Sequence, residues 1–190
     1  MAYDPKAHHR RSIRLRGWDY ARPGLYFVTV CTQAKEHVFG AVADGEMRLN
    51  EYGRNVAACW EELPRHYPRI RVDGFIVMPN HVHGIIEILD VGAGLKPAPT
   101  VRNGIAGAGL KPAPTRGHSV SEIVRAFKTF SARGVNRLRR TAGKPLWQRN
   151  YYEHIIRNER ELAAIQEYIA SNPVRWDTDP ENPAATMASP

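Results

Sequence analysis

Two histidines separated by a single residue, His81 and His83, are the first side chains whose spacing could support chemistry. They begin an apolar run that is typical of a strand, and alternate residues of a strand point to the same face of a sheet. Both imidazoles would then project together while Val82 turns to the core. This arrangement begins a metal site that still needs one or two further ligands. A pair of surface histidines beside the turn at 79–80 is the alternative, and the motif alone leaves both interpretations open.

Tyr168 and Asn172 form the second candidate pair, because they are four residues apart and a helix is expected from about 159 to 171. Residues at this spacing share one face of a helix. A tyrosine hydroxyl can attack phosphorus as a nucleophile, and an asparagine carbonyl oxygen is a hard ligand for a cation. The spacing by itself favours the simpler alternative, in which Tyr168 packs and Asn172 ends the helix before Pro173.

The basic residues are clustered as well as numerous. Lys and Arg total 27 against 19 Asp and Glu, which gives a formal net charge of +8. Residues 1–16 hold five basic residues against one acidic residue, and residues 116–144 hold eight against one. Two basic blocks favour a nucleic-acid partner over a small acidic substrate. A merely soluble basic protein is the alternative.

The composition excludes several classes of protein. Hydrophobic residues make up 43% and charged residues 24% of the 190 residues, which is typical of a globular chain of one domain. The two cysteines, Cys31 and Cys59, are too few for a disulfide scaffold or a zinc finger. The sequence shows no apolar run long enough to cross a bilayer and no secretory signal, so we expect a cytoplasmic, nucleoid-associated protein.

The expected elements alternate between strands and helices. Strands are predicted at 25–32, 70–78, 81–89 and 146–156, with a hairpin at 38–49 that turns at 44–45. Helices are predicted after Asn50 to about 63, from a capping box at Ser119 and Glu122 to about 140, and at 159–171. The connections between the central strands are too short for parallel crossovers. The fold class is therefore α+β, an antiparallel sheet with helices packed on one face.

Two segments look unlike the rest of the expected domain at 1–190. The motif GAGLKPAPT occurs at 92–100 and again at 107–115, and its Gly, Pro and Ala content predicts a flexible linker at about 91–118. The Pro-rich segment at 177–190 is expected to be a disordered tail.

The segment GFIVMPNHVHGIIEI resembles the HUH motif, in which a hydrophobic residue separates two histidines, of single-tyrosine transposases. More narrowly, the chain resembles the REP-associated tyrosine transposases. The matching segments are RRSIRLRGWDY, PGLYFVTVCTQ, SEIVRAFKTFSARGVN and PLWQRNYYEHIIRNERELAAIQEYIASNPVRW. Only the repeat segment and the last dozen residues lie outside the resemblance.

The resemblance implies a ferredoxin-like, RRM-like sheet with the HUH motif on a central strand. It assigns His81 and His83 as metal ligands, Tyr168 as the nucleophile, and Asn172 as the residue that completes the metal site. Many relatives carry glutamine at the last position, and asparagine is shorter by one methylene. Tyr151 and Tyr152 are rival nucleophiles on an expected strand.

The reaction implied by the resemblance is cleavage and transfer of single-stranded DNA beside imperfect palindromic hairpins. Mg²⁺ or Mn²⁺ would polarise the scissile phosphate, and Tyr168 would form a 5′-phosphotyrosine and release a 3′-hydroxyl. Such chemistry serves DNA transposition or the processing of REP elements, by a monomer or a homodimer. The alternatives are a non-catalytic nucleic-acid binder of the same fold and a metal-dependent phosphodiesterase that uses water.

Phosphate contacts position DNA, and aromatic side chains can stack on its bases. The residues expected to bind DNA are Arg10, Arg11, Arg14, Arg16, Arg125, Lys128, Arg133, Trp147, Tyr151 and His154.

Overall fold

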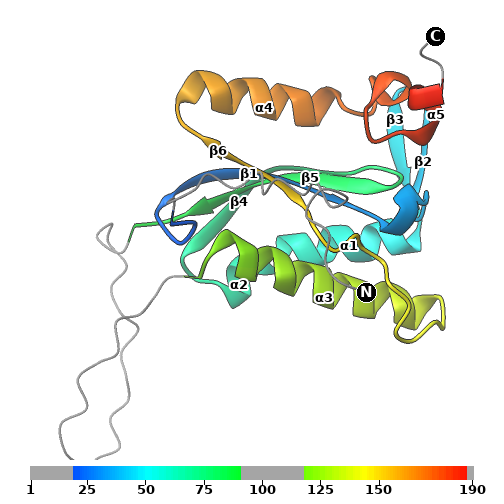
Figure 1. Ribbon diagram of the computed structural model, residues 1–190, viewed down its shortest axis with the longest axis horizontal. Coiled ribbons are helices and arrows are strands. Elements are labelled where there is room, and N and C mark those ends of the chain that lie inside the picture. Colours follow the sequence, from blue (N-terminus) through cyan, green and yellow to red (C-terminus); the bar gives the residue numbers. More distant parts are fainter. Residues whose placement is uncertain (1–18, 91–117, 188–190) are drawn as a thin grey trace, which may run out of the picture.

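The computed structural model describes residues 19–90 and 118–187, and Figure 1 shows how their helices and strands are arranged. The strands are β1 (Gly24–Cys31), β2 (Gly40–Ala43), β3 (Glu46–Leu49), β4 (Ile70–Val77), β5 (His81–Ile88) and β6 (Tyr152–Ile156). The helices are α1 (Glu51–Glu61), α2 (Leu63–His66), α3 (Val120–Leu138), α4 (Glu159–Ser171) and α5 (Pro183–Met187), with 3-10 helices η1 (Gln33–Lys35) and η2 (Trp176–Thr178). The basic block at 1–16 and the predicted linker, apart from its last residue, lie outside the described residues.

The main sheet has the strand order β4-β5-β1-β6, and every neighbouring pair is antiparallel. The histidine pair lies on β5, a central strand, where His81 faces Cys31 and His83 faces Thr29 of β1. Thr29 also pairs with Tyr152 of β6 on its other side. The predicted α+β class, the antiparallel sheet and the central position of the HUH strand are confirmed.

The helices lie on both faces of this sheet. Helices α1, α2 and α3 cover one face, and α4 lies across the other (Figure 1). The expectation that all helices share one face is therefore wrong for α4. The reason is that β5 is apolar on both sides: Val82 and Ile86 belong to the core under α1 and α3, whereas Ile85 packs in a second cluster with Ile169 of α4. In the part of the chain that the structure describes, no helix is both long and apolar enough to span a bilayer.

The larger core is built around Trp60 of α1. Its ring stacks on Phe75 at a centroid distance of 4.7 Å and meets the edge of Phe127 at 5.3 Å. Gly84 of β5 lies directly beneath this ring, and a Cβ atom at that position would overlap the indole. Close contact between α1 and the sheet therefore depends on glycine at this point of the HUH strand.

The helix N-caps predicted from the sequence at Asn50 and Ser119 are present in the structure. The Asn50 side chain accepts hydrogen bonds from the amides of Tyr52 and Gly53, and Ser119 and Glu122 form the predicted capping box. The predicted helix after Asn50 forms as α1 followed by the short α2. The hairpin turns as predicted at Asp44 and Gly45, which both have positive φ. Its first strand is β2 and does not include Val38 and Phe39, because the backbone amides of these two residues donate to the carbonyl of Pro79.

The strand predicted at 146–156 forms only in its second half, as β6. The segment before it is held differently, because the Lys128 ammonium donates hydrogen bonds to the carbonyls of Gln148 and Arg149 at 2.6 and 3.0 Å. Trp147 contributes a single bridge to Thr32 beyond the end of β1.

The prediction of a disordered tail at 177–190 is wrong for residues 177–187, which form the end of η2, a turn and α5. Asp179 and Asn182 are buried, with 4% and 3% of their surface exposed. Their polar groups have partners: the Asn182 amide donates to the carbonyl of Trp176, and the Asp179 carboxylate accepts from the amide of Asn172. Polar composition resembles a tail, but here it supplies the hydrogen bonds that fix the segment.

Candidate active site

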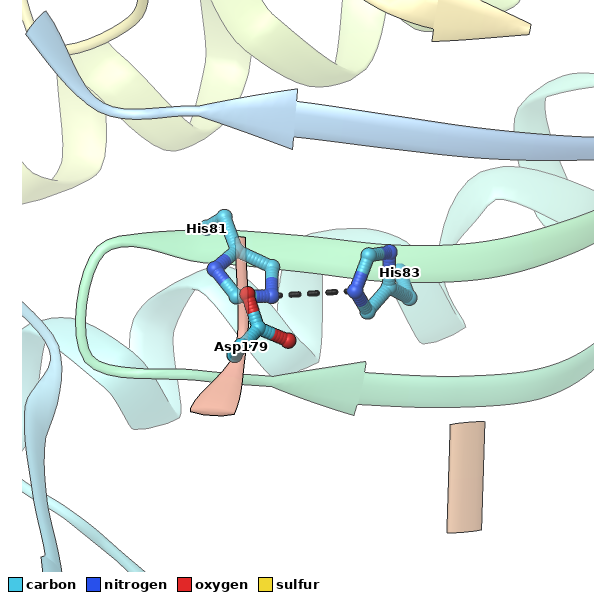
Figure 2. A group of neighbouring side chains, drawn as sticks. All are labelled: His81, His83 and Asp179. Atoms are coloured by element: carbon cyan, nitrogen blue, oxygen red, sulfur yellow. Dashed lines mark hydrogen bonds between the residues drawn. The ribbon is translucent and has the colours of Figure 1, made fainter. Parts of the chain in front are cut away.

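The site lies on the face of the sheet that α4 covers. His81 and His83 are 0% and 2% exposed, and their Nε2 atoms are 3.0 Å apart (Figure 2). Alternation along β5 brings both imidazoles to one face, as the sequence predicted. Figure 2 also shows the carboxylate of Asp179 beside the two rings.

Asn80 fixes the tautomer of His81. Its amide nitrogen donates to the carbonyls of Lys35 and Glu181, so its Oδ1 must face His81 Nδ1, at 2.8 Å. An amide oxygen only accepts, so Nδ1 of His81 carries the proton and Nε2 presents a lone pair. Contacts of this kind orient the histidines that bind metals.

Thr29 performs a related role for His83. Its hydroxyl lies 2.8 Å from His83 Nδ1, and a hydroxyl can either donate or accept. Thr29 therefore supports both tautomers of His83, including the one that leaves Nε2 able to bind a cation. Burial lowers the pKa of His81 to about 3, helped by the charge of Lys35, and lowers that of His83 to about 3, helped by the neighbouring His81. Both rings are therefore neutral near pH 7, the form that binds metals.

Asp179 joins the histidines from the segment after η2. One carboxylate oxygen and one nitrogen from each histidine all lie within 4.8 Å of one another, and all three residues are buried. Sequence reasoning missed Asp179 because it placed this residue in a disordered tail. A local signal exists in the Asp-Pro-Glu triplet, where the Asp179 carboxylate accepts from the Glu181 amide at 2.6 Å, but it indicates a turn and not a metal site.

Asn172, the predicted third ligand, immediately follows α4 and is 1% exposed. Its Nδ2 donates to Asp179 Oδ2 at 2.9 Å, while its Oδ1 is buried without a hydrogen-bond partner among the described residues. A buried acceptor left unsatisfied costs about 1–3 kcal/mol. Asn172 also lies close enough to His81 to raise the pKa of that ring slightly, against the larger effect of burial. A cation at this point would satisfy the amide oxygen.

Tyr168 approaches from the same helix. Its hydroxyl lies 3.3 Å from His83 Nε2, and its ring meets the edge of Phe27 at a centroid distance of 6.1 Å. Burial raises the pKa of Tyr168 to about 12, and the carboxylates of Asp179 and Glu181 act in the same direction. The structure thus brings together the four residues predicted for the catalytic and metal roles and adds Asp179 to them.

The chemistry of the donors fits a divalent cation. The Nε2 atoms of His81 and His83 lie 3.0 Å apart. With the oxygens of Asp179 and Asn172, the donor set combines imidazoles and hard oxygens, which suits Mn²⁺ well and is compatible with Mg²⁺.

The residues predicted to bind DNA separate into distinct places. Arg10, Arg11, Arg14 and Arg16 lie outside the described residues. A groove of about 660 Å³ between α3 and the segment at 143–151 is lined by Arg125, Lys128, Arg133, Trp147 and Tyr151, together with Lys144 and Arg149. Its lining within the described residues contains no acidic side chain. Because α3 and α4 lie on opposite faces of the sheet, this groove is on the far side from His81.

Two residues that were predicted to contact DNA, Trp147 and His154, make contacts within the protein that limit their access to DNA. Trp147 is 7% exposed, contacts the rings of Phe39 and Phe127, and donates to Ser131, so little of its ring is open to a base. His154 lies outside the groove, with its Nε2 2.6 Å from Glu161 Oε1.

Comparison with known proteins places the chain among relatives along most of its length. No protein-family model matches the chain. An uncharacterised protein of Haemophilus influenzae is 41% identical over 179 residues, which cover 93% of this chain and 95% of the relative. A second protein of that organism, named "Putative REP-associated tyrosine transposase", is 27% identical over 158 residues, 83% of this chain and 74% of the relative. The chain is therefore a homologue of REP-associated tyrosine transposases.

A solved structure supports the same fold for this transposase homologue. The structure of a REP-associated tyrosine transposase bound to a REP hairpin covers 86% of this chain and 74% of that chain, with a TM-score of 0.55 and 18% sequence identity. At this identity the likeness establishes the fold. The family resemblance predicted from the HUH motif and the segments around it is confirmed.

Proposed function

We propose that this family member cleaves and rejoins single-stranded DNA through a 5′-phosphotyrosine at Tyr168. The observation that carries the proposal is the position of the Tyr168 hydroxyl, 3.3 Å from His83 Nε2 and beside a buried group of two imidazoles and a carboxylate. A nucleophile beside a cation site suits phosphoryl transfer, because the cation stabilises charge on the phosphate that the nucleophile attacks.

His81, His83, Asp179 and Asn172 are the residues that would hold Mg²⁺ or Mn²⁺. Such an ion supplies charge that polarises the scissile phosphate and stabilises the transition state. The Asn172–Asp179 hydrogen bond keeps these two oxygen donors together, and Asn80 and Thr29 orient the two histidines. These hydrogen bonds therefore hold the candidate metal ligands in place before DNA binds.

Tyr168 would carry the covalent step. Its pKa of about 12 means that the hydroxyl is protonated near pH 7, so the oxygen must lose its proton as it attacks. The Tyr168 oxygen forms a bond to phosphorus, the bond from phosphorus to the 3′-oxygen breaks, and that oxygen takes up a proton. Reversal of this step by a 3′-hydroxyl rejoins DNA without an external energy source.

The substrate class follows from the basic groove and from the family. Arg125, Arg133, Lys144 and Arg149 are exposed around one groove and would contact phosphates. The related transposase of known structure binds a REP hairpin. We therefore assign single-stranded DNA with imperfect palindromic hairpins as substrate, in DNA transposition or in the processing of REP elements.

The deciding experiment incubates the protein with hairpin-containing single-stranded DNA and Mn²⁺ or Mg²⁺, followed by a denaturing gel. The proposal requires a covalent protein–DNA adduct that maps to Tyr168 by mass spectrometry and is absent in Tyr168→Phe. Tyr151→Phe, on the other face of the sheet, is the matched control and should still form it. Cleavage without an adduct would indicate a hydrolase that uses water, and neither product would indicate a non-catalytic binder.

A further inference from the structure

Tyr152 is an exposed aromatic residue in line with the candidate active site. It pairs with Thr29 across β6 and β1, and Thr29 pairs with His83 across β1 and β5. Residues paired in this way lie side by side on the same face of a sheet. Tyr152 therefore belongs to the row that carries a candidate metal ligand, on the face that α4 covers.

Phe27 joins Tyr152 to the catalytic residues. The Phe27 ring lies 5.4 Å from His83, 6.1 Å from Tyr168 and 6.2 Å from Tyr152, measured between centroids. The rings of Tyr152 and Tyr168 are thus separated by no more than about 12 Å, because each lies about 6 Å from the same ring. A base stacked on Tyr152 would belong to a nucleotide about one to three positions from the phosphate at Tyr168.

The exposure of Tyr152 is unusual for its position. The side chain is 45% exposed, although Phe27 beside it is only 7% exposed. Three other large apolar residues among those described are also exposed: Phe130, Leu138 and Val174. Of these only Phe130 has an aromatic ring, and that ring stacks on His66, away from the site. Strand β6 is also an edge of the sheet, so a chain can reach the ring from the side of the strand.

We propose that Tyr152 stacks on a base that flanks the scissile phosphate and so holds the single strand at the β6 edge during attack by Tyr168. This inference rests on the proposed function and adds a binding residue to it. Stacking on an aromatic ring tolerates any base, since every base has a π-face. Tyr152 would therefore fix the path of the strand without reading its sequence, and it acts as a binding residue and not as a nucleophile.

The test begins with a pool of hairpin oligonucleotides whose stems and flanking single strands have random sequences. The oligonucleotides that bind the wild-type protein are recovered and used below. A fluorescent base analogue, which is quenched by stacking, is placed at each flank position in turn. We expect quenching at one position beside the cleavage point in the wild type and in Tyr152→Phe. In Tyr152→Leu, which keeps an apolar side chain without a ring, the quenching should disappear and binding should weaken about tenfold.

Two controls separate stacking from a general defect. Phe130→Leu removes an aromatic residue of comparable exposure (53%) outside the site and should keep the quenching. With an abasic nucleotide at the quenched position, the wild type and Tyr152→Leu should bind equally. Unchanged quenching in Tyr152→Leu, or a tenfold difference that persists on the abasic strand, would overturn the role of Tyr152.

The adduct assay distinguishes this failure from failure of the proposed function. If the wild type forms the Tyr168 adduct but Tyr152→Leu quenches normally, the stacking role alone is wrong. If the quenching depends on Tyr152 but no adduct forms, the stacking role is supported and the proposed chemistry is wrong.

Discussion

Asn172 donates a hydrogen bond of 2.9 Å from its amide nitrogen to Asp179 Oδ2, and this bond ties the end of α4 to the segment after η2. Helix α4 carries Tyr168, so the bond connects the helix of the candidate nucleophile to a carboxylate eight residues beyond its end. Because the amide nitrogen makes this bond, the buried Asn172 amide oxygen, which has no hydrogen-bond partner among the described residues, is left available to a cation.

Asp179 should contribute directly to metal affinity. Asp179→Asn keeps the shape of the side chain but removes its charge, so Mn²⁺ binding measured by calorimetry should weaken at least tenfold. Asp177→Asn, an equal change at an exposed position of η2, is the control and should bind Mn²⁺ as the wild type does. Equal affinity in both variants would remove Asp179 from the metal site.

The two histidines should separate cleavage from DNA binding. His81→Ala or His83→Ala should abolish metal-dependent cleavage, because each removes a donor that Asn80 or Thr29 orients. DNA binding, measured by gel shift, should change little, because it depends on many Lys and Arg contacts. His66→Ala, an exposed histidine on α2, serves as the control. Cleavage at the wild-type rate in either of the first two variants would show that the histidines are not ligands.

Gly84→Ala should destabilise the fold, because the added Cβ would overlap the Trp60 ring. Forcing a methyl group into a packed core costs about 1–3 kcal/mol, measurable as a fall in the urea midpoint. Gly74→Ala on the neighbouring β4 is the matched control: the nearest atom to its Cβ would be the terminal methyl group of Ile169 at 3.3 Å, which need shift only slightly, so this change should cost less. A neutral Gly84→Ala would mean that Trp60 can move away from the HUH strand.

The capping box of α3 should make stability depend on pH. The Ser119 amide holds the pKa of Glu122 below its ordinary value of 4.5, so the folded state favours the carboxylate. A lowered pKa stabilises the fold above pH 4.5, and this contribution disappears as the pH falls through and below that value. The difference in unfolding free energy between the wild type and Glu122→Gln should therefore be larger at pH 7 than at about pH 3.

The Ser119 side of the same box offers an independent measurement. Ser119→Ala should cost about 1 kcal/mol at pH 7, because it removes the cap of the Glu122 amide. If Glu122→Gln shows the same difference at both pH values, the carboxylate does not contribute through its charge.

Sequence reasoning located the parts of the site that depend on local periodicity. Alternation along a strand places His81 and His83 on one face, and the helical repeat places Tyr168 and Asn172 on one face. The pairing of β5 with β1 and the packing of α4 on the sheet then bring the two pairs together. Local rules also found the caps at Asn50 and Ser119, since a cap depends on residues within one turn.

The errors concern contacts between distant segments. Asp179 reaches the histidines across about a hundred residues of sequence, and no spacing rule links them. Trp147 was predicted to stack on exposed bases, but its packing against Phe39 and Phe127 leaves it only 7% exposed. The position of α4 on the second face was missed for the same reason, because a short apolar strand does not reveal whether one or both of its sides are covered.

Asp179 is the last of the candidate site residues to be added to the nascent chain during translation. Translation delivers His81 and His83 first, Tyr168 much later and Asp179 after them, with α4 already complete. A nascent chain therefore contains the candidate nucleophile before it contains the last of the candidate metal donors. A product that stopped after α4 would carry Tyr168 and both histidines but lack the Asp179 carboxylate, so its candidate metal site would be incomplete.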